Sequence, residues 1–309
     1  MNIKRAIGGF LLSFVFLIFF AYMIFAVQWI FDNYPQSQNK NIFLGDISDS
    51  ITPLPPFDFA QRNNSQQTGE INIDAQSAIS VETNLQDMNK VLFEKDINAQ
   101  LPIASLTKLM TAVIVLDNYN LSDITVVNNI ADSQVPINQD VKLGDIMPVE
   151  NFLEIMLIES SNKSAYALSE KMGEPKFIEL MNKKAKDLGL QNTFFADPTG
   201  LSPENVSTTS DLTKLAEYIL KNYPKIADIS MAKELNVPNF GRITNTDHLL
   251  GEIPEIIFSK TGFTEEAKGC LLLVVNNSKN NDYLINVILN SNDRFEEMKK
   301  IINWIDAAQ

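Results

Sequence analysis

The stretch LPIASLTKLMTAVIVLD, residues 101–117, decides how this chain folds. Its apolar residues recur at i, i+3, i+4, i+7 and i+8, the positions that share one face of an α-helix, and further apolar residues surround the axis. The residues that set this period are Leu106, Leu109, Met110, Val113 and Ile114. A helix that is apolar nearly all the way round is buried, so the pattern predicts a central helix packed inside a domain.

Ser105, Lys108 and Thr111 form the polar strip of this predicted helix. Ser105 and Lys108 are three residues apart, which places them on one face, about one turn apart and within reach of each other. Burial disfavours an ammonium and lowers its pKa, so a buried lysine can act as a base near neutral pH. The pair is a candidate nucleophile and base. The spacing alone also fits a capping serine beside an exposed lysine.

Shorter elements are predicted on both sides of the central helix. The predicted strands are residues 78–81, 91–93, 256–259, 270–275 and 283–289. The predicted helices are residues 149–172, with a break at 160–162, and residues 175–188, 212–222 and 293–307. Strands at both ends that enclose helices indicate an α+β fold, with one antiparallel sheet flanked by helices and a helical subdomain inserted between its strands.

The break at residues 160–162 has the sequence Ser160-Ser161-Asn162. A hydroxyl and an amide two residues apart can hold a peptide carbonyl and relay a proton. The alternative is a simple helix break with an N-cap, because Ser and Asn serve that purpose very commonly.

Lys260-Thr261-Gly262 follows an apolar predicted strand. A cation and a hydroxyl at a strand edge suit a substrate carboxylate, and glycine lets a ligand approach the backbone closely. The alternative is a strand end followed by a turn.

Composition excludes several classes of function. The net charge is −13 and no run of Lys or Arg is present, which argues against a nucleic-acid partner. With one cysteine, Cys270, and one histidine, His248, the chain lacks the ligands of most zinc sites, so no metal and no cofactor is expected. Cys270 lies in an apolar context and is expected to pack as a small hydrophobe. A serine hydrolase of this composition uses either His248 or a lysine as its base.

The amino-terminal part predicts a membrane anchor. Residues 6–31 carry no charge and exceed the roughly 20 residues needed to span a bilayer. Lys4 and Arg5 before them place residues 1–5 in the cytoplasm by the positive-inside rule. Residues 32–70 are rich in Asn, Gln, Ser and Pro and are expected to be a flexible linker. The catalytic domain, residues 71–309, is then expected outside the cytoplasmic membrane, on a single-pass anchor.

Ser-x-x-Lys, Ser-x-Asn and Lys-Thr-Gly, in this order, form a signature of β-lactamases and penicillin-binding proteins. From about Ala75 onward the chain resembles the D-alanyl-D-alanine carboxypeptidases of the low-molecular-weight penicillin-binding proteins, the serine peptidase S11 family. The similar stretches are residues 102–112 (PIASLTKLMTA), 181–182 with 188–189, 197–201 (DPTGL), 206–212 (VSTTSDL), 244–246 (TNT), and 260–264 (KTGFT) with 269–271. The resemblance implies the β-lactamase/DD-peptidase-like fold.

The same resemblance implies a reaction. Ser105 would attack the D-Ala-D-Ala bond of a peptidoglycan stem peptide and form an acyl-enzyme, while Lys108 takes its proton. Ser160 would pass a proton to the leaving D-alanine, and water would then release the shortened stem. His248 would have no catalytic role. β-Lactams would act as covalent inhibitors.

Substrate binding is implied for five further residues. Asn162 would hold the substrate amide, and Lys260 with Thr261 would bind the terminal carboxylate beside Gly262. The oxyanion hole would consist of the backbone N–H groups of Ser105 and Phe263.

The chain departs from the family pattern at two positions of the second motif. Ser161 stands where glycine is frequent, and Lys163 stands where an acidic residue is common, which is expected to alter the electrostatics of the cleft without removing a catalytic group. Many relatives also carry a carboxyl-terminal β-domain and a terminal amphipathic membrane helix, and the sequence here stops just after Trp304.

Competing functions remain within this resemblance. A β-lactamase of class A would need a deacylating glutamate, and no Glu-x-x-Leu-Asn stretch follows Asn162. A D,D-endopeptidase acting on cross-linked stems would use the same residues. A β-lactam or wall sensor would acylate without turnover, and its output would have to come from a partner because residues 1–5 are too few for an output domain. An inactive structural relative is disfavoured because every motif residue is present.

Overall fold

The computed structural model describes residues 71–85, 89–136, 140–277 and 282–308. The predicted cytoplasmic stub, transmembrane anchor and linker, residues 1–70, lie outside these ranges. Within the described ranges, no helix combines the length and the apolar character needed to cross a membrane.

A five-stranded antiparallel sheet joins the two ends of the described chain, in the order β2-β1-β11-β10-β9. Its strands are β1 (Ala75–Thr83), β2 (Asn89–Lys95), β9 (Ile256–Thr264), β10 (Lys268–Asn277) and β11 (Asp282–Ser291). Because β1 pairs with β11, the first and the last strand lie side by side and the helical residues between them form an insertion. The predicted α+β fold is confirmed.

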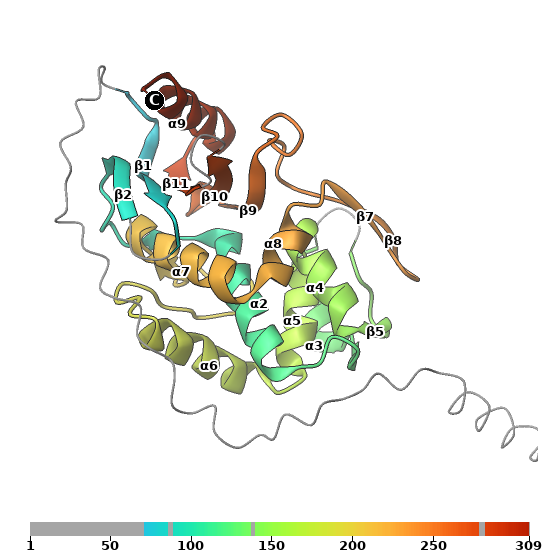
Figure 1. Ribbon diagram of the computed structural model, residues 1–309. Coiled ribbons are helices and arrows are strands. Elements are labelled where there is room, and N and C mark those ends of the chain that lie inside the picture. Colours follow the sequence, from blue (N-terminus) through green and yellow to red (C-terminus); the bar gives the residue numbers. More distant parts are fainter. Residues whose placement is uncertain (1–70, 86–88, 137–139, 278–281, 309) are drawn as a thin grey trace, which may run out of the picture. The chain divides into compact units, whose positions relative to one another are not determined.

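The two faces of the sheet are covered by different helices. Side chains alternate along a strand, so Leu272 of β10 and Val287 of β11 belong to the core shared with the helical subdomain, whereas Leu271 and Ile288 pack in a second core with the closing helix. That helix is α9 (Arg294–Ala308). Figure 1 shows α9 on one side of the sheet and α7 on the other.

The helical subdomain is built around α2, the predicted central helix. Its elements are a 3-10 turn η1 (Ala104–Leu106) and helices α2 (Thr107–Asn118), α3 (Asn129–Asp132), α4 (Val149–Ile158), α5 (Asn162–Glu170), α6 (Glu174–Asp187), α7 (Thr209–Asn222) and α8 (Pro224–Ser230). Every residue of α2 from Thr107 to Val115 is buried. Burial of each large apolar side chain contributes about 1.5–3 kcal/mol, so α2 is an energetic centre of the domain as well as a geometric one.

The central helix begins later than its apolar pattern predicts. It starts at Thr107, and Ser105 lies in the preceding 3-10 turn. Ala104 has φ +46°, a left-handed conformation that cannot continue into a regular α-helix. Leu101 and Pro102 pair instead with Val206 and Ser207 as the short strands β3 and β6.

Two further strand pairs were not predicted from the sequence. They are β4 (Ile124–Val126) with β5 (Ile146–Pro148), and β7 (Glu234–Val237) with β8 (Gly241–Thr244). Each strand is only three or four residues long, too short for an alternating pattern to stand out.

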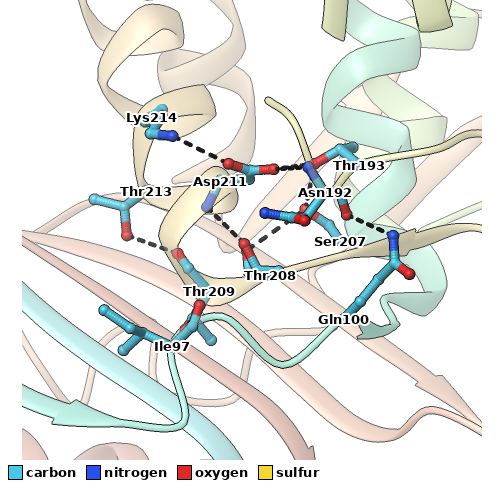
Figure 2. Close-up of polar contacts among 10 residues, drawn as sticks. All are labelled: Ile97, Gln100, Asn192, Thr193, Ser207, Thr208, Thr209, Asp211, Thr213 and Lys214. Atoms are coloured by element: carbon cyan, nitrogen blue, oxygen red, sulfur yellow. Dashed lines mark hydrogen bonds and ion pairs between the residues drawn. The ribbon is translucent and has the colours of Figure 1, made fainter. Parts of the chain in front are cut away.

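A polar network fastens the start of α7 to the strands that lead into η1 (Figure 2). The Thr208 hydroxyl caps α7 by accepting from the Asp211 N–H at 3.0 Å. Asp211 Oδ2 accepts from the Asn192 N–H at 2.8 Å and from the Thr193 hydroxyl at 3.0 Å. The amide of Gln100, next to β3, donates to the Asn192 carbonyl at 3.1 Å. These bonds connect α7 to the segment that carries Ser105.

Candidate active site

Ser105 and Lys108 meet as their spacing predicts. Lys108 Nζ lies 2.8 Å from Ser105 Oγ, and the Lys108 side chain is fully buried. Its nitrogen also donates to Asn162 Oδ1 and to the Thr199 carbonyl, each at 2.8 Å. The alternative of an exposed first-turn lysine is therefore wrong.

The Lys108 nitrogen is suited to exchange a proton with Ser105. Burial lowers the pKa of Lys108 from 10.5 to about 7, although the carboxylates of Asp197 and Asp140 oppose this shift. Two of its three partners are carbonyl oxygens, which only accept hydrogen bonds. A neutral amine keeps two N–H donors for those oxygens and turns its lone pair toward the Ser105 hydroxyl. The same geometry thus accommodates the ammonium and the free base.

The loop 197–201 builds the third contact of Lys108. Asp197 Oδ1 accepts from the Thr199 N–H at 2.6 Å, the Thr199 hydroxyl at 2.7 Å and the Gly200 N–H at 2.7 Å. These bonds fold the loop tightly, so the Thr199 carbonyl faces Lys108. Gly200 has φ +89°, and a Cβ there would lie 1.8 Å from the Ala104 carbonyl oxygen. Glycine is therefore required where this loop supports the turn that carries Ser105.

The second motif lies at the break between α4 and α5. Ser160 has φ +64°, and its hydroxyl accepts from Lys260 Nζ at 2.9 Å. Ser161 is the N-cap of α5 and accepts from the Ser164 N–H at 3.0 Å. The interpretation as a helix break with an N-cap is therefore confirmed for Ser161, whereas the proton relay by Ser160 stays a prediction. Asn162 opens α5 and reaches Lys108.

Lys260, Thr261 and Gly262 lie inside β9, which extends to Thr264, so the prediction that they end a strand is wrong. β9 is an edge strand of the sheet. A Cβ on Gly262 would lie 3.0 Å from the Ser105 backbone nitrogen, so its glycine allows β9 to pass close to the turn η1. Phe263 follows in β9 with an exposed side chain. The oxyanion hole of the Ser105 and Phe263 N–H groups stays a prediction.

Lys260 carries a second perturbed amine. Burial, followed by the positive charges of Lys108 and Arg294, holds the pKa of Lys260 well below its usual range, while Asp247 raises it. Its nitrogen donates to Ser160 Oγ and, at 3.0 Å, to the Thr261 carbonyl. A carboxylate placed beside Lys260 would favour the ammonium form.

Sequence reasoning gave no role to several residues around these motifs. Thr246 Oγ1 lies 2.5 Å from Thr261 Oγ1, and its N–H donates to the Ile158 carbonyl at 3.2 Å. Asp197, Thr246 and the 197–201 loop fall in stretches that resemble the family, which was the available signal. Asp140, by contrast, lies in none of those stretches.

The two departures from the family pattern have local partners. The Ser161 hydroxyl donates to Asp140 Oδ1 at 2.5 Å. Lys163 forms an ion pair with Asp132 of α3 at 2.7 Å. The positive charge that replaces an acidic residue is therefore compensated by a neighbouring helix.

Cys270 and His248 take no part in the hydrogen bonds among these motifs. Cys270 is fully buried, and burial raises the pKa of its thiol to about 11, so it packs as expected and stays protonated. The His248 ring stacks on Phe295 of α9 with a centroid separation of 5.0 Å. Among the described residues, no three His, Cys, Asp or Glu side chains gather as a metal site.

Similar proteins are known by sequence. Residues 61–293 match the family Peptidase S11, described as D-alanyl-D-alanine carboxypeptidase. A D-alanyl-D-alanine endopeptidase of Escherichia coli K12 is 33% identical over 271 residues, covering 83% of this chain and 85% of the relative. The D-alanyl-D-alanine carboxypeptidase DacF of Bacillus subtilis is 31% identical over 270 residues, covering 84% of this chain and 68% of the relative.

Solved structures give the same result. Penicillin-binding protein D2 of Listeria monocytogenes in its ampicillin-bound form aligns with a TM-score of 0.68 at 25% identity, covering 76% of this chain and 99% of that one. The D-alanyl-D-alanine carboxypeptidase of Mycobacterium tuberculosis aligns with a TM-score of 0.68 at 27% identity, covering 79% and 96%. Because the family match covers most of the chain, this protein belongs to the D-alanyl-D-alanine carboxypeptidase family of serine peptidases, Peptidase S11.

Proposed function

We propose that this protein is a serine-type D-Ala-D-Ala carboxypeptidase that removes the terminal D-alanine from peptidoglycan stem peptides through an acyl-enzyme at Ser105. The observation that carries the proposal is the buried Lys108 amine, 2.8 Å from Ser105 Oγ. With a pKa of about 7, it can accept the serine proton at neutral pH.

In the acylation step, Ser105 Oγ forms a bond to the carbonyl carbon between the two D-alanines as its proton passes to Lys108. The resulting oxyanion is stabilised by the N–H groups of Ser105 and Phe263. The C–N bond then breaks, and the leaving amine takes a proton from the Ser160 hydroxyl. Ser160 recovers it through Lys260, whose nitrogen is 2.9 Å away. Water then hydrolyses the ester: its hydroxyl group stays on the acyl carbon, and its proton restores the Ser105 hydroxyl as the shortened stem leaves. Return of one proton from Lys108 to Lys260 restores the starting charges of both amines.

In this proposal, residues of β9 recognise the free carboxyl end of the substrate peptide. Lys260 and Thr261 bind the terminal carboxylate, and Asn162 binds the substrate amide through its side chain. Gly262 supports this arrangement because its lack of a side chain leaves room for η1 beside the strand. β-Lactams, which present a carboxylate and a strained amide, acylate the same serine. The ampicillin-bound form of the Listeria relative supports this part of the proposal.

A second candidate activity is D,D-endopeptidase action on cross-linked stems. The relatives named D-alanyl-D-alanine endopeptidase from Escherichia coli and Pseudomonas aeruginosa, each 33% identical to this chain, favour it. Both reactions use the same nucleophile and differ in what is attached to the leaving amine.

We also propose that residues 6–31 anchor the protein in the cytoplasmic membrane, with the amino terminus in the cytoplasm and the catalytic domain outside. The uncharged, apolar sequence of this segment supports the proposal. Residues 32–70 then give the domain its reach toward the wall. Protease protection of the amino terminus in closed spheroplasts, together with cleavage of the catalytic domain, would test this orientation.

The test of the function uses purified full-length chain, the Ser105→Ala variant, and two substrates, a monomeric pentapeptide muropeptide and a cross-linked dimer. Mass spectrometry reports the products. Loss of one alanine from the monomer, only with intact Ser105, establishes the carboxypeptidase, and conversion of dimer to monomers establishes the endopeptidase. Penicillin labelling without any turnover would replace both activities with a sensor.

A further inference from the structure

We propose that Asp140 is a positioning residue for the Lys108–Asn162 pair, that it acts through the Ser161 hydroxyl, and that its carboxylate helps to set the charge of Lys108. The proposal rests on the proposed function, because it requires Lys108 to act as the base.

The contact between Ser161 and Asp140 is short and largely shielded from water. Ser161 Oγ donates to Asp140 Oδ1 at 2.5 Å, a length typical of a hydroxyl bonded to a carboxylate. Ser161 is fully buried, and the Val141 N–H donates to the same carboxylate oxygen at 2.9 Å. Since a hydroxyl has a single proton, the donor capacity of Ser161 is committed to Asp140.

The acceptor side of the same hydroxyl holds α5. Ser161 Oγ accepts from the Ser164 N–H at 3.0 Å, which caps the first turn of that helix. Asp140 thereby fixes the rotamer of the capping side chain. Because Asn162 is the first residue of α5, this cap also determines where the Asn162 side chain begins.

Asn162 transmits this position to Lys108. Its Oδ1 accepts from Lys108 Nζ at 2.8 Å, and its Nδ2 donates to the Val135 carbonyl at 3.0 Å. The amide is thus held from both ends, with its oxygen toward the lysine. If the Ser161 cap were displaced, the Asn162 oxygen would move. Lys108 would then lose one of the three contacts that orient its nitrogen.

The charge of Asp140 acts on Lys108 as well. Four charged groups are concerned: Asp197 and Asp140 favour the Lys108 ammonium, Lys260 faces Lys108 from β9, and Glu159 interacts with Asp140 itself. Asp140 is the one of these four groups that forms a hydrogen bond to Ser161, the residue that caps the helix carrying Asn162. Removal of its charge lowers the pKa of Lys108 further, because one of the two carboxylates that favour the ammonium is lost.

The chain offers a matched control, a second carboxylate that contacts α5. Asp132 of α3 pairs with Lys163, the residue after Asn162, at 2.7 Å. Asp132 therefore also links α5 to its surroundings by a carboxylate, but its partner is the half-buried Lys163 and not the capping serine. Asp132→Asn removes a carboxylate that contacts the same helical turn without touching the chain of bonds to Lys108.

The experiment measures the rate constant for acylation by a fluorescent penicillin across pH values on both sides of 7, with full-length protein. In Asp140→Asn, acylation at its optimum is expected to fall about 10-fold or more. The acid limb of its pH profile is expected to move to lower pH by about half a unit or more. In Ser161→Ala, which keeps the carboxylate, the rate is expected to fall while the limb moves much less. Asp132→Asn is expected to keep the wild-type acylation rate and the wild-type position of the acid limb of the pH profile.

Two further variants separate positioning from a general loss of structure. Asp140→Glu keeps the charge and is expected to retain the wild-type acid limb. In the double variant Asp140→Asn/Ser161→Ala, the fold-loss in acylation rate is expected to be clearly smaller than the product of the two single fold-losses, because both substitutions break the same hydrogen bond.

An unchanged acid limb in Asp140→Asn would overturn the proposal, as would an equal shift in Asp132→Asn. These results are distinct from failure of the proposed function, which would appear as the absence of Ser105-dependent acylation in the wild-type chain.

Discussion

Ser105 and Lys108 belong to different elements, η1 and α2, and yet their side chains meet at 2.8 Å. The 3-10 turn runs directly into the helix, so the three-residue spacing still places both side chains on one side of the axis. The turn brings Ser105 beside the edge strand β9. At that point the Gly262 backbone lies close to the backbone nitrogen of Ser105. This arrangement brings together the proposed nucleophile, the proposed base and the strand proposed to bind the substrate carboxylate.

Ser105→Ala is expected to abolish covalent labelling by penicillin and release of D-alanine, because it removes the only atom proposed to form the acyl bond. Gel fluorescence with a labelled penicillin and mass spectrometry of the digest provide the measurements. Circular dichroism and the melting temperature serve as controls, since Ser105 is half-buried and its loss should leave the fold intact. Labelling retained by this variant would refute the assignment of the nucleophile.

Lys108→Arg is expected to reduce acylation by about a thousandfold or more, because a guanidinium cannot lose its proton in a protein. In the wild-type chain, the acylation rate is expected to fall as pH decreases through about 7, the pKa of Lys108. The sign follows from the chemistry: protonation below this pKa removes the lone pair that accepts the serine proton. A flat pH profile between 5.5 and 8 would show that another group is the base.

Gly200→Ala is expected to destabilise the domain by about 3 kcal/mol or more, since the new Cβ would meet the Ala104 carbonyl oxygen at 1.8 Å. Gly189→Ala is the matched control: it also has a positive φ, +68°, but a Cβ there meets nothing within 4 Å. Its expected cost is about 1 kcal/mol, from backbone strain alone. Chemical denaturation measures both, and equal costs would contradict the proposed contact between the 197–201 loop and η1.

Binding of a peptide with a free terminal carboxylate is expected to be coupled to proton uptake by Lys260. In the unbound chain burial holds the pKa of Lys260 well below its usual range, and an adjacent carboxylate raises it. At a pH above the unbound pKa, the complex therefore takes up a proton. Calorimetry of the Ser105→Ala variant in buffers of different ionisation enthalpy measures this uptake.

The control for proton uptake is the Ser105→Ala/Lys260→Ala double variant with the same ligand. It is expected to bind more weakly and without uptake. If uptake persisted in the double variant, the proton would be going to another group, with Lys108 the next candidate to examine.

Local sequence patterns determined most of the architecture. The apolar period of residues 106–114, the alternating strands at the two ends and the break at residues 160–162 each depend on neighbours within a few positions, so they can be recognised without the fold. The order of the three motifs, compared with the family, likewise indicated which residues carry the chemistry. Short strands such as β7 and β8 were not predicted, because they contain too few residues to form an alternating pattern.

Tertiary structure alone decided the surroundings of Lys108. Its partners Asn162 and Thr199 are 54 and 91 positions away in the chain, and no local pattern specifies a hydrogen bond over such a separation. The same holds for the contact between Asp140 and Ser161 and for the collision that excludes a side chain at Gly200. The sequence by itself named the serine and the lysine that we propose as nucleophile and base. The pKa of that lysine, in contrast, depends on how deeply the folded chain buries it and on which distant carboxylates lie near it, because desolvation and Coulomb interactions are set by distance in space.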